Sequence, residues 1–129
     1  MMTPDLRPAS IRAYWPVLQP LFARALRGDD DTPESIYTRV AAGDASLFVG
    51  DGAAFVLTAG VGRAVPTVRV WLMVSWGPHG ATDRHLPALV DLARANGARR
   101  LVFTSCRRGW ARKVKCGNGD AWTTYILRI

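Results

Sequence analysis

The chain has 129 residues, of which 49% are hydrophobic and 21% charged. These values are typical of a single globular domain with a core of its own. No stretch approaches the roughly 18 apolar residues of a membrane span. Met1–Pro8 lacks the basic-then-apolar order of a secretory signal, so we expect a cytoplasmic protein.

The two cysteines are too few for a disulfide framework, and the cysteines and histidines together do not define a metal centre. Cys106 and Cys116 are the only two cysteines, and in a cytosolic protein they are best interpreted as partly buried thiols. With His79 and His85 they show no recognised ligand spacing, so we predict no metal site.

The formal net charge of +7 is unevenly distributed along the chain. Eight basic residues and no acidic residue lie between Leu92 and Gly119, whereas six of the ten acidic residues lie between Asp29 and Asp51. A basic region of this kind attracts phosphates, from a nucleotide cofactor, a nucleic acid or an acidic partner. The alternative is a solvated surface without a partner.

The N-terminal third predicts two helices. Apolar residues recur at helical spacing from Ile11 to Leu26, although Pro16 and Pro20 predict a kink or a division into two shorter helices. Thr32-Pro33 is a good start for the next helix, because Thr caps the first turn and Pro is tolerated at the first position. Gly43 fits its end.

Strands dominate the middle of the chain. Ser46–Val49 and Ala54–Thr58 flank Gly50-Asp51-Gly52, where Asp-Gly favours a tight hairpin turn. Val68–Trp76 is a long apolar run rich in β-branched and aromatic residues, and it is predicted to be the central strand.

The C-terminal part predicts a crossover unit. A helix within Thr82–Asn96 leads to a strand at Leu101–Ser105, which should run parallel to the central strand. A short basic helix near Arg107 and a last strand at Ala121–Ile129 complete a mixed α/β sheet. The predicted core comprises Trp71, Met73, Leu89, Val102 and Phe103. Ligands of such units bind where a strand ends and the next helix begins, here Trp76–Asp83.

Four stretches carry a resemblance to a known family: Ser46–Val49 with its following strand, Val70–Gly77, Leu92–Leu101 and Arg108–Arg112. From about Ser10 onward the chain resembles the Gcn5-related N-acetyltransferase (GNAT) fold. It is more closely similar to small GNAT-like proteins of tailed bacteriophages. The resemblance implies an α/β (α+β mixed sheet) fold, acetyl-CoA as cofactor and acetylation of an amine.

In this family, backbone amides at the start of the helix after the central strand hold the cofactor pyrophosphate. The resemblance implies cofactor contacts from Trp76, Gly77, His79, Gly80, Ala81, Thr82 and Arg84. The loop is degenerate, because its glycines are three apart, the usual Gln or Arg is missing and Pro78 has no N–H. No carboxylate lies on Val68–Trp76, so His79 is the candidate base.

A second hypothesis keeps the fold without the activity. The protein would then be a binding module, either a virion or assembly component or a host-directed inhibitor. Its basic face would contact an acidic protein or nucleic acid through Arg107, Arg108, Trp110, Arg112 and Lys113. A third hypothesis, a small nucleic-acid-binding protein, needs only the basic face. Trp76 and Trp110 adjoin glycine turns and are candidates for stacking on a flat ligand.

Overall fold

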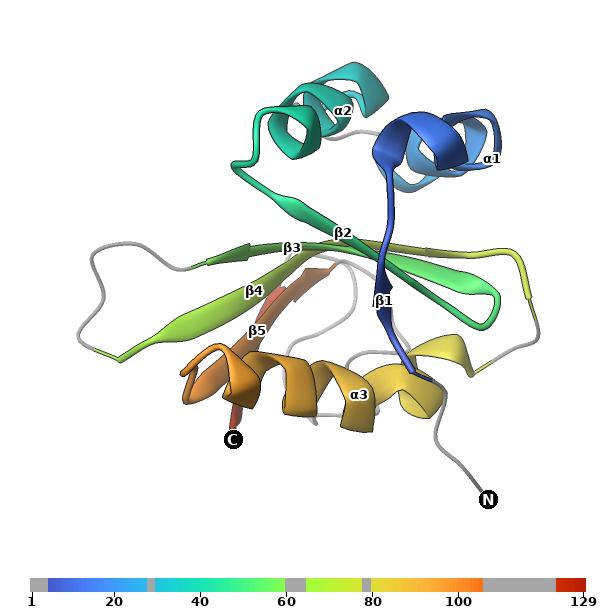
Figure 1. The fold of residues 1–129 in the computed structure, drawn as a ribbon. Coiled ribbons are helices and arrows are strands. Elements are labelled where there is room, and N and C mark those ends of the chain that lie inside the picture. Colours follow the sequence, from blue (N-terminus) through green and yellow to red (C-terminus); the bar gives the residue numbers. More distant parts are fainter. Residues whose placement is uncertain (1–4, 28–29, 60–64, 78–79, 106–122) are drawn as a thin grey trace.

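The structure is a computed structural model that describes residues 5–27, 30–59, 65–77, 80–105 and 123–129. Within these ranges, three helices and six strands follow one another in a mixed α/β order (Figure 1). Their bounds are β1 (Arg7–Pro8), α1 (Ile11–Ala25), α2 (Pro33–Ala41), β2 (Ser46–Gly50), β3 (Ala53–Ala59), β4 (Thr67–Ser75), α3 (Ala81–Ala95), β5 (Arg100–Ser105) and β6 (Thr123–Arg128).

The strands form one sheet in the order β1-β2-β3-β4-β5-β6. Neighbours are antiparallel, apart from β4 and β5, which are parallel and are joined through α3. The predicted parallel crossover is therefore confirmed. The predicted hairpin is confirmed as well, because β2 and β3 pair around a turn in which Gly52 has a φ of 72°.

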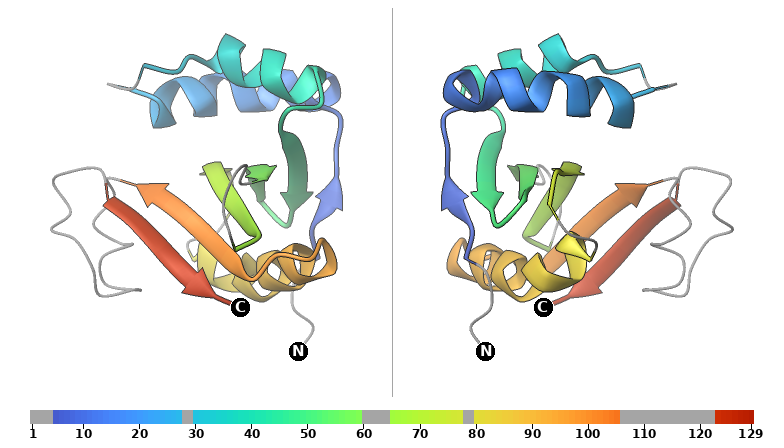
Figure 2. Two further views of the ribbon diagram at one scale, coloured as in Figure 1. Left: turned by 90° about the vertical axis from the view of Figure 1, so that its left-hand side faces the viewer. Right: turned by 90° about the vertical axis from the view of Figure 1, so that its right-hand side faces the viewer.

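The helices cover both faces of the sheet. Helices α1 and α2 lie together on one face and α3 lies on the other (Figures 1 and 2). Two apolar clusters fill the space between these layers. The first contains Leu18, Phe22, Ile36 and Val56, and the second contains Phe55, Leu89, Leu101 and Phe103.

The predicted core is confirmed most firmly at Leu89 and Phe103, which are 0% and 2% exposed. Trp71 and Met73 pack at the edges of the two clusters and are partly buried. Val102 is also partly buried.

Of the two alternatives predicted for the first helix, a kink or a division into two shorter helices, the division is not found. Helix α1 is continuous from Ile11 to Ala25 with Pro16 and Pro20 inside it. Ser10 caps its start by accepting a hydrogen bond from the Ala13 N–H at 3.3 Å. Burial of Leu18 and Phe22 against the sheet stabilises the helix, and this outweighs the donor that each proline removes.

The second helix agrees with the sequence. Thr32 accepts the Ser35 N–H at 3.1 Å, and the Ser35 hydroxyl accepts the Thr32 N–H at 3.0 Å. This reciprocal pair is a capping box with Ser in place of Glu or Gln. The helix ends at Ala41, and Gly43 follows with a φ of 84°.

Two further predictions concern the C-terminal part. Strand β6 (Thr123–Arg128) confirms the last strand. The short basic helix near Arg107 lies outside the described residues.

Candidate cofactor site

The parallel strands β4 and β5 pair along only part of their length. Their register runs from Thr67 opposite Arg100 to Val70 opposite Phe103. Strand β4 continues to Ser75, and there it remains paired with β3 on its other side. Among the described strands, none pairs with the β5-facing edge of β4 beyond Val70. A ligand with amides of its own could pair with backbone groups on this edge.

A β-bulge begins at the point where β4 and β5 stop pairing. Val56 pairs with Leu72 and Leu57 pairs with Val70, which leaves Trp71 without an opposite residue on β3. A bulge increases local twist and redirects the strand. Trp71 is fixed there, because its Nε1–H donates to the Asp31 carboxylate at 3.3 Å and the Arg39 guanidinium lies 5.2 Å from its ring centre.

Helix α3 begins just beyond the end of β4. Its N-cap is Gly80, with a φ of 80° and no side chain to satisfy the first-turn amides. A Cβ at Gly80 would meet nothing within 4 Å, so this helix start is open. Backbone amides at the start of a helix and the helix dipole favour an anion, although the Asp83 carboxylate in the same turn opposes one here.

The amides just before this loop already have a partner. The N–H groups of Trp76 and Gly77 both donate to the Gly52 carbonyl, at 2.9 and 3.1 Å. The backbones approach so closely that a Cβ on Gly77 would lie 2.9 Å from the Gly52 Cα. Among the described residues, the amides that could bind an anion at this end of β4 are therefore those from Gly80 onward.

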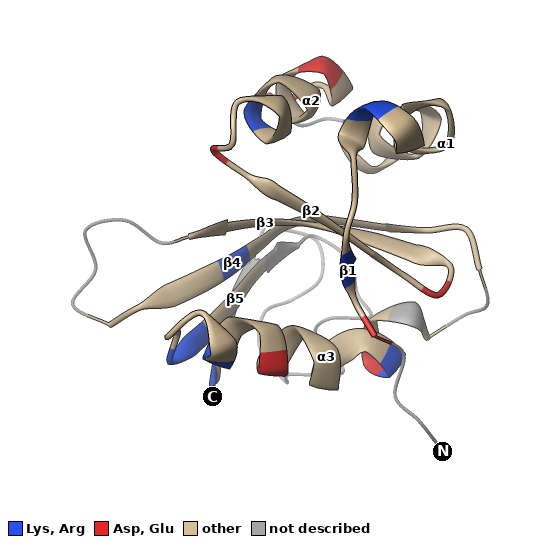
Figure 3. Ribbon diagram, in the orientation of Figure 1, with Lys and Arg blue, Asp and Glu red and all other residues tan. Residues whose placement is uncertain are grey.

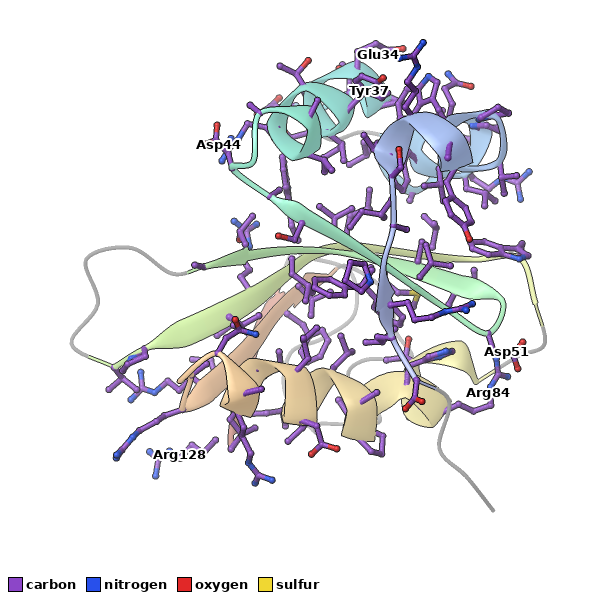
Figure 4. All side chains as sticks on the ribbon, viewed as in Figure 1. Glu34, Tyr37, Asp44, Asp51, Arg84 and Arg128 are labelled. Carbon is purple, nitrogen blue, oxygen red and sulfur yellow. The ribbon has the colours of Figure 1, made fainter. Side chains whose placement is uncertain are left out.

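The first turns of α3 are fastened to the turn between β2 and β3. His85 is 0% exposed, and its Nε2 accepts the Asp51 N–H at 3.0 Å. Arg84 donates from Nη2 to the Asp51 carbonyl at 3.2 Å, and Figure 4 shows these two side by side. A Cβ at Gly50 would overlap the His85 imidazole. These contacts fix the position of the helix N-terminus relative to the sheet.

The side chain of Thr82 points inward rather than into the loop. Thr82 is 5% exposed, and its hydroxyl lies 3.9 Å from the Met73 sulfur. Only its backbone N–H remains for the predicted cofactor contact.

An open cleft of about 610 Å³ lies beside the end of β4. Its lining mixes charged, aromatic and backbone groups from β1, α1, the β2–β3 turn and the residue after β4. These are Asp5, Arg7, Tyr14, Val49, Gly50, Asp51, Gly52 and Trp76. Trp76 is 43% exposed, so its indole presents an apolar face to a ligand here.

The sequence predicted the residues between β4 and α3 but not the residues on the other side of the cleft. The structure brings Trp76, Gly77, Gly80, Ala81, Thr82 and Arg84 together between the end of β4 and the start of α3. The residues that the sequence did not indicate are Asp5, Tyr14 and Asp51, which come from the distant N-terminal part of the chain. His79 lies outside the described residues.

Several other predictions also lie outside the described residues. These are the partner residues Arg107, Arg108, Trp110, Arg112 and Lys113. Among the residues that the structure does describe, no group of three or more His, Cys, Asp or Glu could hold a metal ion. No helix in those ranges is both long and apolar enough to cross a membrane.

The fold is shared with several solved acetyltransferases. An acetyltransferase from Thermus thermophilus has a TM-score of 0.61 and 18% identity, with 99% of this chain and 98% of that chain covered. A GNAT-family acetyltransferase from Brucella melitensis, solved in complex with acetyl-CoA, has a TM-score of 0.61 and 12% identity over 97% and 87% of the two chains. A chain of the NatC complex bound to Gag peptide and CoA has a TM-score of 0.67 and 10% identity over 99% of both chains.

No protein-family model matches the sequence, and no curated protein sequence matches it. The structural likeness nevertheless defines the class of fold. The chain has the GNAT-like fold, a mixed sheet with α1 and α2 on one face and α3 on the other.

Proposed function

We propose that this protein is an acetyl-CoA-dependent N-acetyltransferase with a degenerate cofactor loop. The observation that carries the proposal is the partial pairing of β4 with β5, which ends at Val70, while β4 itself continues to Ser75 and is followed by the N-terminus of α3. Solved proteins of the same fold include one in complex with acetyl-CoA and one bound to CoA.

The cofactor would lie against two backbone features. The extended pantetheine arm carries amides that match the exposed edge of β4 beyond Val70. Its pyrophosphate would be held by the α3 amides from Gly80 to Thr82, where the helix dipole favours negative charge. Arg84 lies in the same turn and adds a positive charge.

The acceptor amine would enter through the cleft beside Trp76. Asp5 and Asp51 can attract an ammonium group, and Trp76 and Tyr14 can contact its apolar part. The bound ammonium group must first lose one proton to become a neutral amine. Attack of this amine on the thioester carbonyl forms the C–N bond and breaks the C–S bond, while a second proton leaves the nitrogen and one proton reaches the departing sulfur. His79 remains the candidate base.

An inactive binding module is the second candidate function. One observation favours it. The Trp76 and Gly77 amides donate to the Gly52 carbonyl, so fewer backbone donors remain to bind a pyrophosphate. In this case the protein would be a virion or assembly component or a host-directed inhibitor. Its place would be the host cytoplasm or the virion. The phage origin rests on the sequence resemblance.

Calorimetric titration with acetyl-CoA, followed by a thiol-release assay over a set of amines, separates the two functions. We expect saturable binding and release of CoA with at least one amine. If acetyl-CoA binds but no amine causes release of CoA, the protein is a cofactor-binding module. If acetyl-CoA does not bind at millimolar concentration, the transferase function is rejected.

A charge variant locates the pyrophosphate. Ala81→Glu places a carboxylate in the first turn of α3, where it suits the helix dipole but repels phosphate. We expect the affinity for acetyl-CoA to fall at least about tenfold, because the new carboxylate would repel the pyrophosphate at close range. Ala13→Glu is the matched control, because exposed Ala13 occupies the first turn of α1. Equal losses in both variants would place the phosphates elsewhere.

A further inference from the structure

Three arginines from three adjacent strands lie on one face of the sheet. Leu101, Phe103 and Leu127 pack toward α3, so Arg100 and Arg128, one residue away, point to the opposite face. Arg69 stands between Val68 and Val70, which also pack toward α3, and therefore shares that opposite face.

The sheet register places these side chains next to one another. Arg100 lies directly opposite Arg128, and Arg69 lies opposite Val102 in the parallel pair. Val102 in turn lies opposite Ile126. The result is a surface in which three guanidinium groups adjoin two apolar side chains. We call this surface, Arg69, Arg100, Val102, Ile126 and Arg128, the arginine face.

The arginine face is open to solvent. Ile126 is 55% exposed, Arg69 and Arg128 are exposed, and Arg100 and Val102 are half-buried. Figure 3 shows a positive charge on β4 and another near the C-terminus, and those at the C-terminal end of α3 lie on the other face of the sheet.

No described carboxylate balances these charges. The ion pair found among the described residues joins Arg39 to Asp44 at 3.9 Å, on other elements. Like charges directly opposite each other on neighbouring strands repel, as Arg100 and Arg128 do. A bound polyanion would remove this repulsion.

We propose that the arginine face binds a single-stranded nucleic acid. Guanidinium groups bind phosphate in a bidentate manner and also stack on bases. Phosphates can pair with the guanidinium groups of Arg69, Arg100 and Arg128, and unpaired bases can stack on these groups or contact the neighbouring Val102 and Ile126. A duplex hides its bases from a flat sheet face and would leave the apolar pair without a contact.

An acidic protein is a weaker fit to this surface. Protein interfaces are typically anchored by a buried aromatic residue. The five residues of the arginine face include no Trp, Tyr or Phe. A protein partner would find no aromatic anchor among these residues, and its contacts would be limited to the three arginines and to Val102 and Ile126.

This surface is separate from the candidate cofactor site. Arg69 and Arg100 lie at the start of β4 and β5, whereas the loop follows the end of β4 at Ser75. At about 3.3 Å per residue, the six residues from Arg69 to Ser75 span roughly 20 Å. Nucleic-acid binding therefore does not depend on the proposed transferase function.

The test uses fluorescence anisotropy of the whole chain with a labelled oligouridine probe of about 20 nucleotides, long enough for a single-strand site, across a salt series. We expect saturable binding at about 50 mM salt that weakens steeply as salt rises. The Arg69→Gln, Arg128→Gln double variant should lose at least about tenfold in affinity. Its log–log salt slope should fall by about 1.4, because each lost phosphate contact contributes about 0.7 on single strands.

The matched control is the Arg12→Gln, Arg24→Gln double variant, which removes the same charge from exposed positions on α1. Equal loss in both double variants would show a net-charge effect only and overturn the proposal. Tighter binding of a polyglutamate probe than of oligouridine would overturn it in favour of an acidic protein. No binding at the lowest salt concentration would also reject it.

Two further variants keep the test decisive if the glutamine variant unfolds. Arg69→Lys, Arg128→Lys retains charge but loses the planar fork, and it should bind several-fold more weakly than the parent with a similar salt slope. Ile126→Ser keeps every charge, and its affinity should fall several-fold if bases contact the apolar pair. Unchanged binding in both would overturn the proposed contact.

Discussion

His85 on α3 accepts the backbone N–H of Asp51 at Nε2, at 3.0 Å, and thereby ties the helix to the turn between β2 and β3. The imidazole is 0% exposed and its ring centre lies 5.5 Å from that of Phe55. Arg84 adds a second bond, to the Asp51 carbonyl. The position of the α3 N-terminus, on which the proposed phosphate site depends, is therefore set by a pair of neighbouring side chains and a tight turn.

Replacement of His85 tests this connection. His85→Ala removes a buried ring and leaves the Asp51 N–H without an acceptor, so the free energy of unfolding should fall by about 2–5 kcal/mol. His85→Phe keeps most of the volume but not the acceptor, and should cost about 1–3 kcal/mol. Urea melts measure both. Wild-type stability in His85→Phe would mean that the hydrogen bond contributes nothing.

Gly50 should be required because of the same imidazole. A Cβ at this position overlaps the His85 ring, so Gly50→Ala should destabilise the fold by about 1–3 kcal/mol. In a His85→Ala background the space is free, and the same substitution should be nearly neutral. A double-mutant cycle of urea melts gives the coupling energy. Additive effects would show that the two residues do not collide.

The core under α3 gives a separate prediction. Leu89 is 0% exposed and packs in the cluster that contains Phe103, so Leu89→Ala should cost about 2–5 kcal/mol. Val17 on α1 is 47% exposed, and Val17→Ala should change stability by less than about 0.5 kcal/mol. A loss below that limit for Leu89→Ala, measured by denaturant melts, would contradict the buried position.

The sequence predicted most of the sheet because its signals are local. The Asp51-Gly52 turn, the Thr32-Pro33 helix start and the apolar run of β4 each depend on a few neighbouring residues. The parallel crossover follows from a strand, a helix and a strand in succession. These elements are confirmed at nearly the predicted bounds.

The features that were missed depend on contacts between distant segments. Strand β1 has two residues, one of them Pro8, and shows no periodicity. The bulge at Trp71 exists only in the register of β4 against β3. The burial of His85 requires its approach to Gly50, far earlier in the chain, and a lone histidine on a helix gives no sign of this. The cleft beside Trp76 combines such distant segments, so no motif marks it.

The contact between Gly77 and Gly52 leads to the last prediction. The Gly52 carbonyl accepts the amides of both Trp76 and Gly77, and a Cβ on Gly77 would lie 2.9 Å from the Gly52 Cα. Gly77→Ala should push the β2–β3 turn away from the end of β4 and weaken both hydrogen bonds, at a cost of about 1–3 kcal/mol. The environment of the half-exposed Trp76 should change with it, which its fluorescence can report.

Gly80→Ala is the comparison for this variant, because a Cβ there has no neighbour within 4 Å. Its cost should come from the positive φ of 80° alone, about 1 kcal/mol, without a change at Trp76. If Gly77→Ala leaves both stability and Trp76 fluorescence unchanged, the turn adjusts freely. The amides at the end of β4 would then be able to leave Gly52 and bind a phosphate instead.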